Sequence, residues 1–179
     1  ASELDVLTLD APVSGGDIGA KNRTLTIMAG GDKAAFEQAT AIFDKISKKA
    51  QYFGPAGSGQ HVKMANQIGI AGTMTAMSEL LVYAQAAGLD LPAVIETLLA
   101  GGANTWSLAN YGPRILKDDY SPGFFVKHFI KDLKIALDES QKMGLDLPAT
   151  QGALALYEKL ADKGFNDAGT QALIKLWWD

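Results

Sequence analysis

The spacing of apolar residues changes once along this chain. In the first third, apolar runs at 6–13 and 25–29 and a brief extended piece at 52–53 flank a segment, 32–47, whose apolar residues recur with helical spacing. Short apolar runs bounded by glycine or proline indicate strands, whereas a 3.6-residue repeat indicates an amphipathic helix. The pattern therefore predicts a small sheet with a helix packed against it.

The helix predicted at 32–47 should begin with Asp32 as its N-cap. We expect one of its faces to be buried, because apolar residues occupy that face at helical spacing. These residues are Phe36, Ala39, Ile42, Phe43 and Ile46.

The rest of the chain has no strand pattern and is predicted to be entirely helical. The predicted helices lie at 58–87, 92–100, 106–117, 124–143, 148–163 and 170–178. The sequence thus predicts an α+β fold that is mainly α. Its domain boundary is expected after residue 56, which gives a sheet-containing domain at 1–56 and an all-helical domain at 57–179.

The segment at 67–88 is almost wholly apolar or small, with Glu79 as its only charge. Its polar residues argue against a membrane span, so a buried helix of a globular protein is the preferred interpretation. Four small residues should let neighbouring helices approach closely: Gly69, Ala71, Gly72 and Ala76. The sequence that follows, G-L-D-L-P-A at 88–93, recurs at 144–149, which we interpret as shared turn chemistry.

Composition narrows the classes of function. Sixteen basic and twenty acidic residues give a net charge of −4 without long runs, so the chain has no basic footprint for nucleic acid. It has no cysteine and only two histidines, which leaves no support for a metal site and is compatible with a reducing cytoplasm. Glu3 and Asp5 interrupt any signal-peptide pattern at the N-terminus.

The strongest candidate site is the segment G-S-G-Q-H-V-K-M-A-N at 57–66. Lys63 and Asn66 are three residues apart on a predicted helix, so they share one face and can point at one small molecule. Most helical lysines are merely solvated, but this one precedes a buried segment. Partial burial near another cation would lower the pKa of Lys63 toward neutrality, where it can both donate and accept a proton.

A second candidate is D-A-P-V-S-G-G-D-I-G-A at 10–20, which leaves a strand and turns through glycines. Ser14 and the backbone N–H groups of Gly15 and Gly16 can cradle a carboxylate or phosphate. The alternative is an ordinary turn at the end of a strand.

A third candidate is the helix expected around 125–138. Its inward residues should be Phe129, Leu133, Ala136 and Leu137, and its basic flank comprises Lys127, Lys131 and Lys134. Such flanks are usually solvated, although one of these lysines could reach an anionic ligand.

Together these segments resemble the β-hydroxyacid dehydrogenase family, whose members include 3-hydroxyisobutyrate dehydrogenase and tartronate semialdehyde reductase. The match comprises D-A-P-V-S-G-G-x-x-G-A at 10–20, G-x-G-x-x-x-K-x-x-N at 57–66 and K-D-L-x-x-A at 131–136, in the family's order. The 6-phosphogluconate dehydrogenases share part of this pattern but carry His-Asn where this chain has Ala65-Asn66, so a sugar phosphate is a less favoured substrate.

The resemblance implies a role for each matching residue. Ser14, Gly15 and Gly16 would hold the carboxylate of a short β-hydroxy acid, Lys63 would be the general acid and base, and Asn66 would orient the substrate. A hydride would pass between the substrate and nicotinamide.

The resemblance also implies a cofactor, NAD or NADP, whose nicotinamide end Lys131 would approach. It further implies a homodimer formed through the helical domain. From the composition we expect a cytoplasmic protein with no membrane or nucleic-acid partner. Apolar residues near the C-terminus are a candidate interface, with packing inside the chain as the alternative: Leu173, Ile174, Leu176, Trp177 and Trp178.

Two departures from the family pattern matter. No G-x-G-x-x-G fingerprint is present, because Val62 stands where the third glycine would follow Gly57 and Gly59. The chain is therefore expected to be a C-terminal portion that starts within a Rossmann-type sheet, and by itself to bind cofactor weakly or not at all and to be inactive. Arg23 replaces a usual glycine, so we expect one of two effects: a different turn before Leu25, or an added positive charge near the anion pocket.

A second class of function stays open at this point. The chain would then be a non-catalytic helical module for dimerisation or partner binding. The presence of Ser14, Lys63 and Asn66 favours the enzyme.

Overall fold

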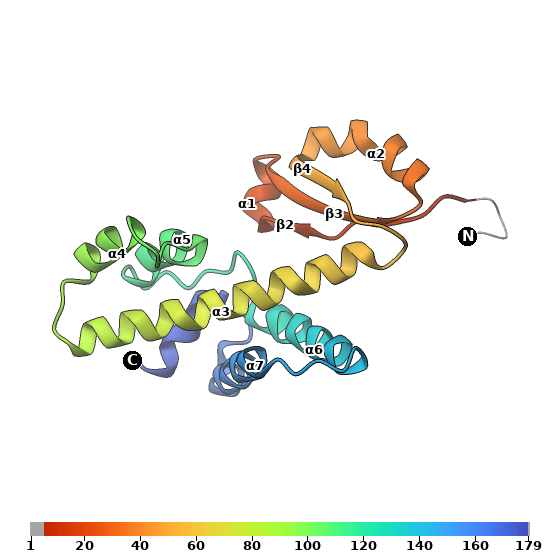
Figure 1. Cartoon of the computed structure of the whole chain (residues 1–179). Coiled ribbons are helices and arrows are strands. Elements are labelled where there is room, and N and C mark those ends of the chain that lie inside the picture. The colour runs from red at the N-terminus through yellow and green to blue at the C-terminus, as the bar shows by residue number, and fades with distance from the viewer. Residues whose placement is uncertain (1–5, 179) are drawn as a thin grey trace. The chain divides into compact units, whose positions relative to one another are not determined.

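The computed structural model describes residues 6–178 of the chain, so Glu3 and Asp5 lie outside the described residues. The chain is α+β and mainly α, as predicted, and it forms two compact units, Ala1–Asn66 and Gln67–Asp179 (Figure 1). Among the described residues, no helix is long and apolar enough to cross a membrane.

A small mixed sheet forms the centre of the first unit. Strand β3 (Leu25–Gly31) is its middle strand and is almost entirely buried. Strands β1 (Leu9–Asp10) and β2 (Val13–Ser14) pair with it antiparallel, and β4 (Ser47–Tyr52) pairs with it parallel. Pro12 separates β1 from β2, yet its carbonyl still accepts a 3.0 Å hydrogen bond from the Met28 N–H. The polypeptide from β1 to β2 therefore follows β3 closely.

Helix α2 (Lys33–Ile46) packs against this sheet through its aromatic residues. The Phe36 ring lies 5.7 Å from the Tyr52 ring and 5.9 Å from the Phe43 ring. The predicted buried face was wrong at Ile42 and Ile46, which are 64% and 40% exposed. The helical spacing of Phe36, Ala39 and Phe43 explains this, because those three form a narrow stripe and the two isoleucines lie to one side of it.

Asp32 occupies the N-cap position of α2, as predicted, but its side chain does not cap the helix. The Asp32 carboxylate instead accepts a 2.8 Å hydrogen bond from the Thr8 N–H. Its charge therefore ties the start of α2 to the chain entering β1.

The glycine-rich segment after β2 contains a short helix, α1 (Gly16–Lys21), where the sequence predicted only a turn. Arg23 follows this helix with a φ of +59°, the left-handed conformation that glycine adopts more easily. The turn before Leu25 therefore keeps a glycine-like backbone despite the arginine.

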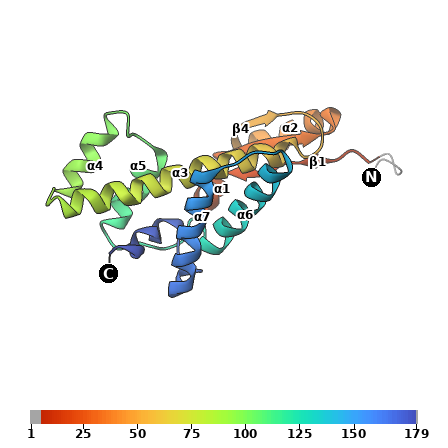
Figure 2. The same cartoon turned by 60° about the horizontal axis from the view of Figure 1, so that its bottom comes forward.

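The helices of the second unit surround one apolar core. The long helix α3 begins in the first unit and continues into the second, and α6 and α7 are neighbours in both views (Figures 1 and 2). The four inward residues predicted on α6 are all buried: Phe129, Leu133, Ala136 and Leu137. The helices are α3 (Ser58–Ala86), α4 (Leu91–Leu99), α5 (Trp106–Ile115), α6 (Val126–Lys142) and α7 (Pro148–Leu160).

The C-terminal segment differs from the prediction. The helix α7 ends at Leu160, and a π-helical turn (Ala161–Phe165) and a 3₁₀ helix (Thr170–Leu176) follow it. Leu173 and Ile174 are fully buried in the core, so assigning them to an interface was wrong and the alternative of internal packing is confirmed. Leu176 and Trp178 pack partly buried against the same core.

Two further details concern glycines. The expectation that Gly69 and Gly72 admit a close neighbour was wrong within this chain, because a Cβ at either position would meet no atom within 4 Å. The recurring G-L-D-L-P-A segments do share turn chemistry, since Gly88 and Gly144 have φ values of +72° and +71°.

Candidate active site around Lys63

Lys63 lies in the first unit, on the second turn of α3, and its side chain reaches β2. Its Nζ donates a 2.9 Å hydrogen bond to the backbone carbonyl oxygen of Val13. Val13 directly precedes Ser14, the first residue of the proposed anion cradle. Residues fifty positions apart in sequence are thus brought together, with the lysine amine beside the serine–glycine bend.

Ser14 and Asn66 lie on the two elements that meet at this amine. Ser14 is the last residue of β2, is half-buried, and pairs with Thr26 of β3. Asn66 lies one helical turn beyond Lys63 on α3 and is also half-buried. A hydroxyl on a strand held by the sheet and an amide on a long helix are rigidly supported groups for binding a small polar ligand.

Gly15 and Gly16 form the bend itself. Their φ values are +125° and +61°, so side chains at either position would strain the backbone. Gly15 is the N-cap of α1, and its carbonyl accepts a 2.9 Å hydrogen bond from the Gly19 N–H. The N–H groups that open a helix have no intrahelical acceptor, so a bend of this shape can hold a carboxylate oxygen.

Asp10 is a contributor to this region that was not predicted from the sequence. The Asp10 carboxylate accepts hydrogen bonds from the N–H groups of Gly57 and Gln60, at 2.8 and 3.0 Å. Gly57 directly precedes α3, and Gln60 lies in its first turn, three residues before Lys63. The signal in the sequence was the aspartate that opens the D-A-P-V-S-G-G motif, but its partners are 47 and 50 residues away.

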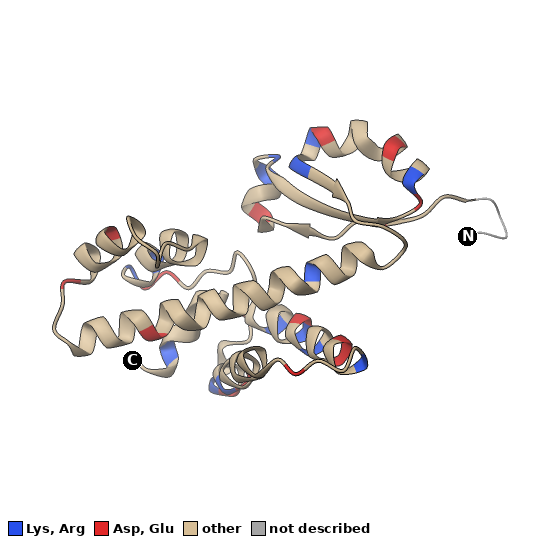
Figure 3. Cartoon of the chain, in the orientation of Figure 1, with Lys and Arg blue, Asp and Glu red and all other residues tan. Residues whose placement is uncertain are grey.

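Lys131 belongs to the second unit and lies on α6. Figure 3 shows that this helix carries both basic and acidic residues. Its Nζ is 2.7 Å from Oδ1 of Asp132, and the lysine side chain is 63% exposed while that of Asp132 is 7% exposed. The other oxygen of the Asp132 carboxylate accepts a 2.7 Å hydrogen bond from Gln67 Nε2. Gln67 was not predicted as a site residue, and Asp132 was quoted only as part of the K-D-L-x-x-A motif, because a buried carboxylate beside an exposed lysine leaves no periodic signal.

The rest of the predicted basic flank of α6 is engaged in ion pairs. Lys127 pairs with Asp167 at 2.5 Å and Lys134 pairs with Glu158 at 2.8 Å. Both pairs are largely exposed, so they contribute little stability. Of the three lysines in this flank, Lys131 is the one whose ion-pair partner, Asp132, is buried.

The ion pair with Asp132 leaves donors on the Lys131 ammonium. An ammonium has three donors, and Asp132 accepts from one of them, so Lys131 can still donate to an oxygen atom of a ligand. Within residues 6–178, no group of three histidine, aspartate or glutamate side chains could hold a metal ion.

Two family models match this chain. Residues 57–177 match a family model described as the NAD-binding domain of NADP-dependent 3-hydroxyisobutyrate dehydrogenase. Residues 1–54 match the NAD-binding domain of 6-phosphogluconate dehydrogenase. Both models describe nicotinamide-dependent dehydrogenases, so NAD or NADP is the cofactor class. The chain belongs to the 3-hydroxyisobutyrate dehydrogenase family.

Individual relatives agree with this assignment. An uncharacterized oxidoreductase of Bacillus subtilis, YkwC, is 51% identical over 99% of this chain and 62% of its own length. The 2-hydroxy-3-oxopropionate reductase of Escherichia coli is 40% identical over 97% of this chain and 60% of its own length. The crystal structure of a 3-hydroxyisobutyrate dehydrogenase from Salmonella typhimurium superposes with a TM-score of 0.89 at 29% identity, over 98% of this chain and 62% of that one. The chain thus spans about three fifths of these relatives.

Proposed function

We propose that the protein carrying this chain is an NAD(P)-dependent dehydrogenase that interconverts a short β-hydroxy acid and its semialdehyde. The observation that carries this proposal is the 2.9 Å hydrogen bond from Lys63 Nζ to the carbonyl of Val13. That contact sets a proton-carrying amine beside a bend suited to a carboxylate. The two groups match the two functional ends of a β-hydroxy acid.

The bend binds the carboxylate end of the substrate in this proposal. Ser14 donates its hydroxyl, and Gly15 and Gly16 donate backbone N–H groups. Asn66, one turn along α3 from the lysine, hydrogen-bonds to the same substrate. These contacts are remote from the reacting carbon. They orient the substrate and so lower the entropic cost of bringing the reacting groups together.

Lys63 moves the proton. As an aldehyde is reduced, negative charge develops on its oxygen, and the ammonium stabilises that charge and then donates its proton. In the oxidation direction the neutral amine takes the proton from the hydroxyl. A bound nicotinamide cofactor would supply or accept the hydride, and Lys131 would donate a hydrogen bond to that cofactor.

The names of relatives support this substrate class. The Escherichia coli relative is named as a reductase of 2-hydroxy-3-oxopropionate, a small molecule with one carboxylate and one aldehyde. We assign residues 1–56 to the cofactor-binding domain and 57–179 to the helical substrate and dimerisation domain. A location in the cytoplasm stays a prediction, and one plant relative is named as mitochondrial.

The test of the proposal is Lys63→Ala in the longest natural polypeptide that contains this chain. Turnover should fall by about three orders of magnitude while cofactor affinity stays within about twofold, since the loss of an acid–base group lowers kcat. Lys127→Ala, which removes an exposed ion pair on α6, is the matched control and should keep its activity. Unchanged turnover in Lys63→Ala would favour the non-catalytic module.

Two accompanying proposals have tests of their own. The chain of residues 1–179 alone should bind NAD and NADP weakly or not at all, and isothermal titration showing micromolar affinity would refute this.

The helical unit should form a homodimer, because it exposes several large apolar side chains. Light scattering that shows a clean monomer at high concentration would count against the homodimer. These side chains include Tyr83, Leu89, Trp106, Ile135, Met143 and Leu145.

A further inference from the structure

The beginning of α3 is capped by a residue that is distant in sequence. The first N–H groups of a helix lack intrahelical acceptors, and a side chain close in sequence usually supplies them. Here Asp10 of β1 does so, with Oδ1 2.8 Å from the N atom of Gly57 and Oδ2 3.0 Å from that of Gln60. Each carboxylate oxygen thus holds one donor at the start of the same helix.

Backbone packing leaves this carboxylate little freedom. A Cβ added to Gly30 of β3 would lie 2.7 Å from the N atom of Gly59 and 2.8 Å from Asp10 Oδ1. A Cβ added to Gly59 would lie 2.7 Å from Asp10 Oδ2. The backbones of α3 and β3 therefore approach with no side chain between them, and the Asp10 carboxylate lies along their contact. The helix cannot shift here without losing charge-assisted hydrogen bonds.

The same short segment of chain also holds Lys63. Val13, three residues after Asp10, accepts the hydrogen bond from Lys63 Nζ, and Lys63 is three residues after Gln60. Segment 10–14 therefore contacts two successive turns of α3, one through a carboxylate and the next through a carbonyl. Ser14 is the last residue of that segment. The position of the amine relative to Ser14 depends on both contacts.

We propose that Asp10 is a positioning residue for the reaction. By fixing the start of α3 against β1 and β3, it sets where the Lys63 amine stands relative to the anion-binding bend. The inference rests on the proposed role of Lys63. It assigns Asp10 no contact with substrate or cofactor.

The experiment compares Asp10→Asn with Asp90→Asn in the longest natural polypeptide that contains the chain. Asp90 is the matched control because its carboxylate caps α4 by accepting from the Ala93 N–H at 3.3 Å. Both variants should lower the melting temperature. Only Asp10→Asn should lower kcat, by about 10- to 100-fold, because a displacement of about 1 Å at a reacting group has a cost of that size. Cofactor affinity should stay within about twofold, and the lysine limb of the pH–rate profile should move.

A double-mutant cycle connects the effect to the lysine. If Asp10 acts through Lys63, adding Asp10→Asn to Lys63→Ala should cause no further loss of kcat, whereas independent effects would multiply. Asp10→Glu provides a second test, since it keeps the charge and both acceptors but moves them by one methylene. It should lower kcat even where Asp10→Asn fails to fold.

The outcomes separate this inference from the proposed function. Wild-type kcat in Asp10→Asn or in a folded Asp10→Glu would overturn the positioning role, as would equal kcat losses in the Asp10 and Asp90 variants. Full turnover in Lys63→Ala would overturn the proposed function instead.

Discussion

Gln67 donates a 2.7 Å hydrogen bond from its side-chain amide to the carboxylate of Asp132, and both residues are buried. The bond joins α3 to α6 within the second unit. A buried carboxylate is costly unless it is hydrogen-bonded, so this contact is important for the packing of the two helices.

Removing the amide should therefore destabilise the helical unit. Gln67→Leu should lower the free energy of unfolding by about 1.5–3 kcal/mol, the range for a hydrogen bond to a charged group. Urea denaturation measures the change. Gln85→Leu, at an exposed position of the same helix, is the control and should change stability by less than about 0.5 kcal/mol. Equal effects of the two variants would contradict the importance of the buried bond.

The proposed carboxylate cradle predicts a change in substrate affinity. Ser14→Ala should raise the KM for a β-hydroxy acid about tenfold or more, because the hydroxyl donates to a charged group. Steady-state kinetics measures it, and cofactor affinity should stay the same. Thr40→Ala is a suitable comparison, since that hydroxyl donates only a 3.0 Å bond to the Phe36 carbonyl on α2. An unchanged KM in Ser14→Ala would remove the serine from the cradle.

A positive charge at position 63 should not be enough for turnover without a group that exchanges a proton. Lys63→Arg keeps a cation beside Val13, but a guanidinium stays protonated throughout the working pH range and cannot exchange a proton. We expect kcat to fall by at least about 100-fold with a smaller change in KM. A variant that keeps half of its wild-type kcat would show that Lys63 acts only electrostatically.

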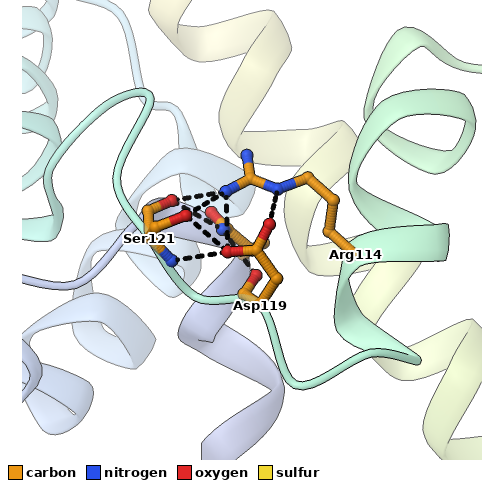
Figure 4. A network of polar contacts seen from close by, with 4 residues as sticks. Arg114, Asp119 and Ser121 are labelled. Atoms are coloured by element: carbon orange, nitrogen blue, oxygen red, sulfur yellow. Dashed lines mark hydrogen bonds and ion pairs between the residues drawn. The ribbon is translucent and has the colours of Figure 1, made fainter.

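The loop after α5 should make stability depend on acidity. Figure 4 shows Asp119 held by Arg114, whose Nε lies 2.8 Å from the carboxylate, and by Ser121. The hydrogen bond from Arg114, followed by those from Ser121, lowers the pKa of Asp119 well below its usual value near 4. The charged form is favoured in the folded state, so its contribution is present above pH ~4 and is lost as pH falls through the lowered pKa.

Asp119→Asn should therefore weaken the dependence of stability on pH below about 4. Chemical denaturation at a series of pH values between about 2 and 6 would measure the slope of the unfolding free energy. Asp44→Asn, at an exposed position on α2, serves as the control. Parallel slopes for wild type and Asp119→Asn would refute the assignment.

Arg23 offers a stabilising change. Its φ of +59° costs a residue with a side chain about 1 kcal/mol relative to glycine. Arg23→Gly should therefore raise the free energy of unfolding by about 0.5–1 kcal/mol, measured by thermal or urea denaturation. The neighbouring Asn22 has a right-handed backbone, with a φ of −89°, so Asn22→Gly should do the opposite. A loss of stability in Arg23→Gly would mean that the arginine side chain makes a compensating interaction.

The sequence predicted most helices well because their signals are local. The buried stripe of α6 follows from the spacing of Phe129 and Leu133, and the helix stops follow from Gly88 and Gly144. Leu173 and Ile174 were assigned to an interface, with internal packing as the alternative, because an apolar run does not show whether it packs within the chain or against a second copy. Ile42 was assigned to the wrong face because spacing does not give the width of the contact.

Site residues that lie in short motifs were predicted from the sequence, whereas contacts between distant segments were not. Lys63 and Ser14 are recognisable because each stands in a motif whose chemistry is compact in sequence. Asp10 was quoted as part of such a motif, but its hydrogen bonds to Gly57 and Gln60 join distant segments and cannot be seen in either segment alone. The same is true of the contact between Gln67 and Asp132.

The close approach of Gly30 to Gly59 limits which substitutions this fold can accept. A library randomised at these two positions should return almost only glycine, because even a methyl group at either site would overlap the opposing main chain. The contact between α3 and β3 near Lys63 therefore has to keep both glycines.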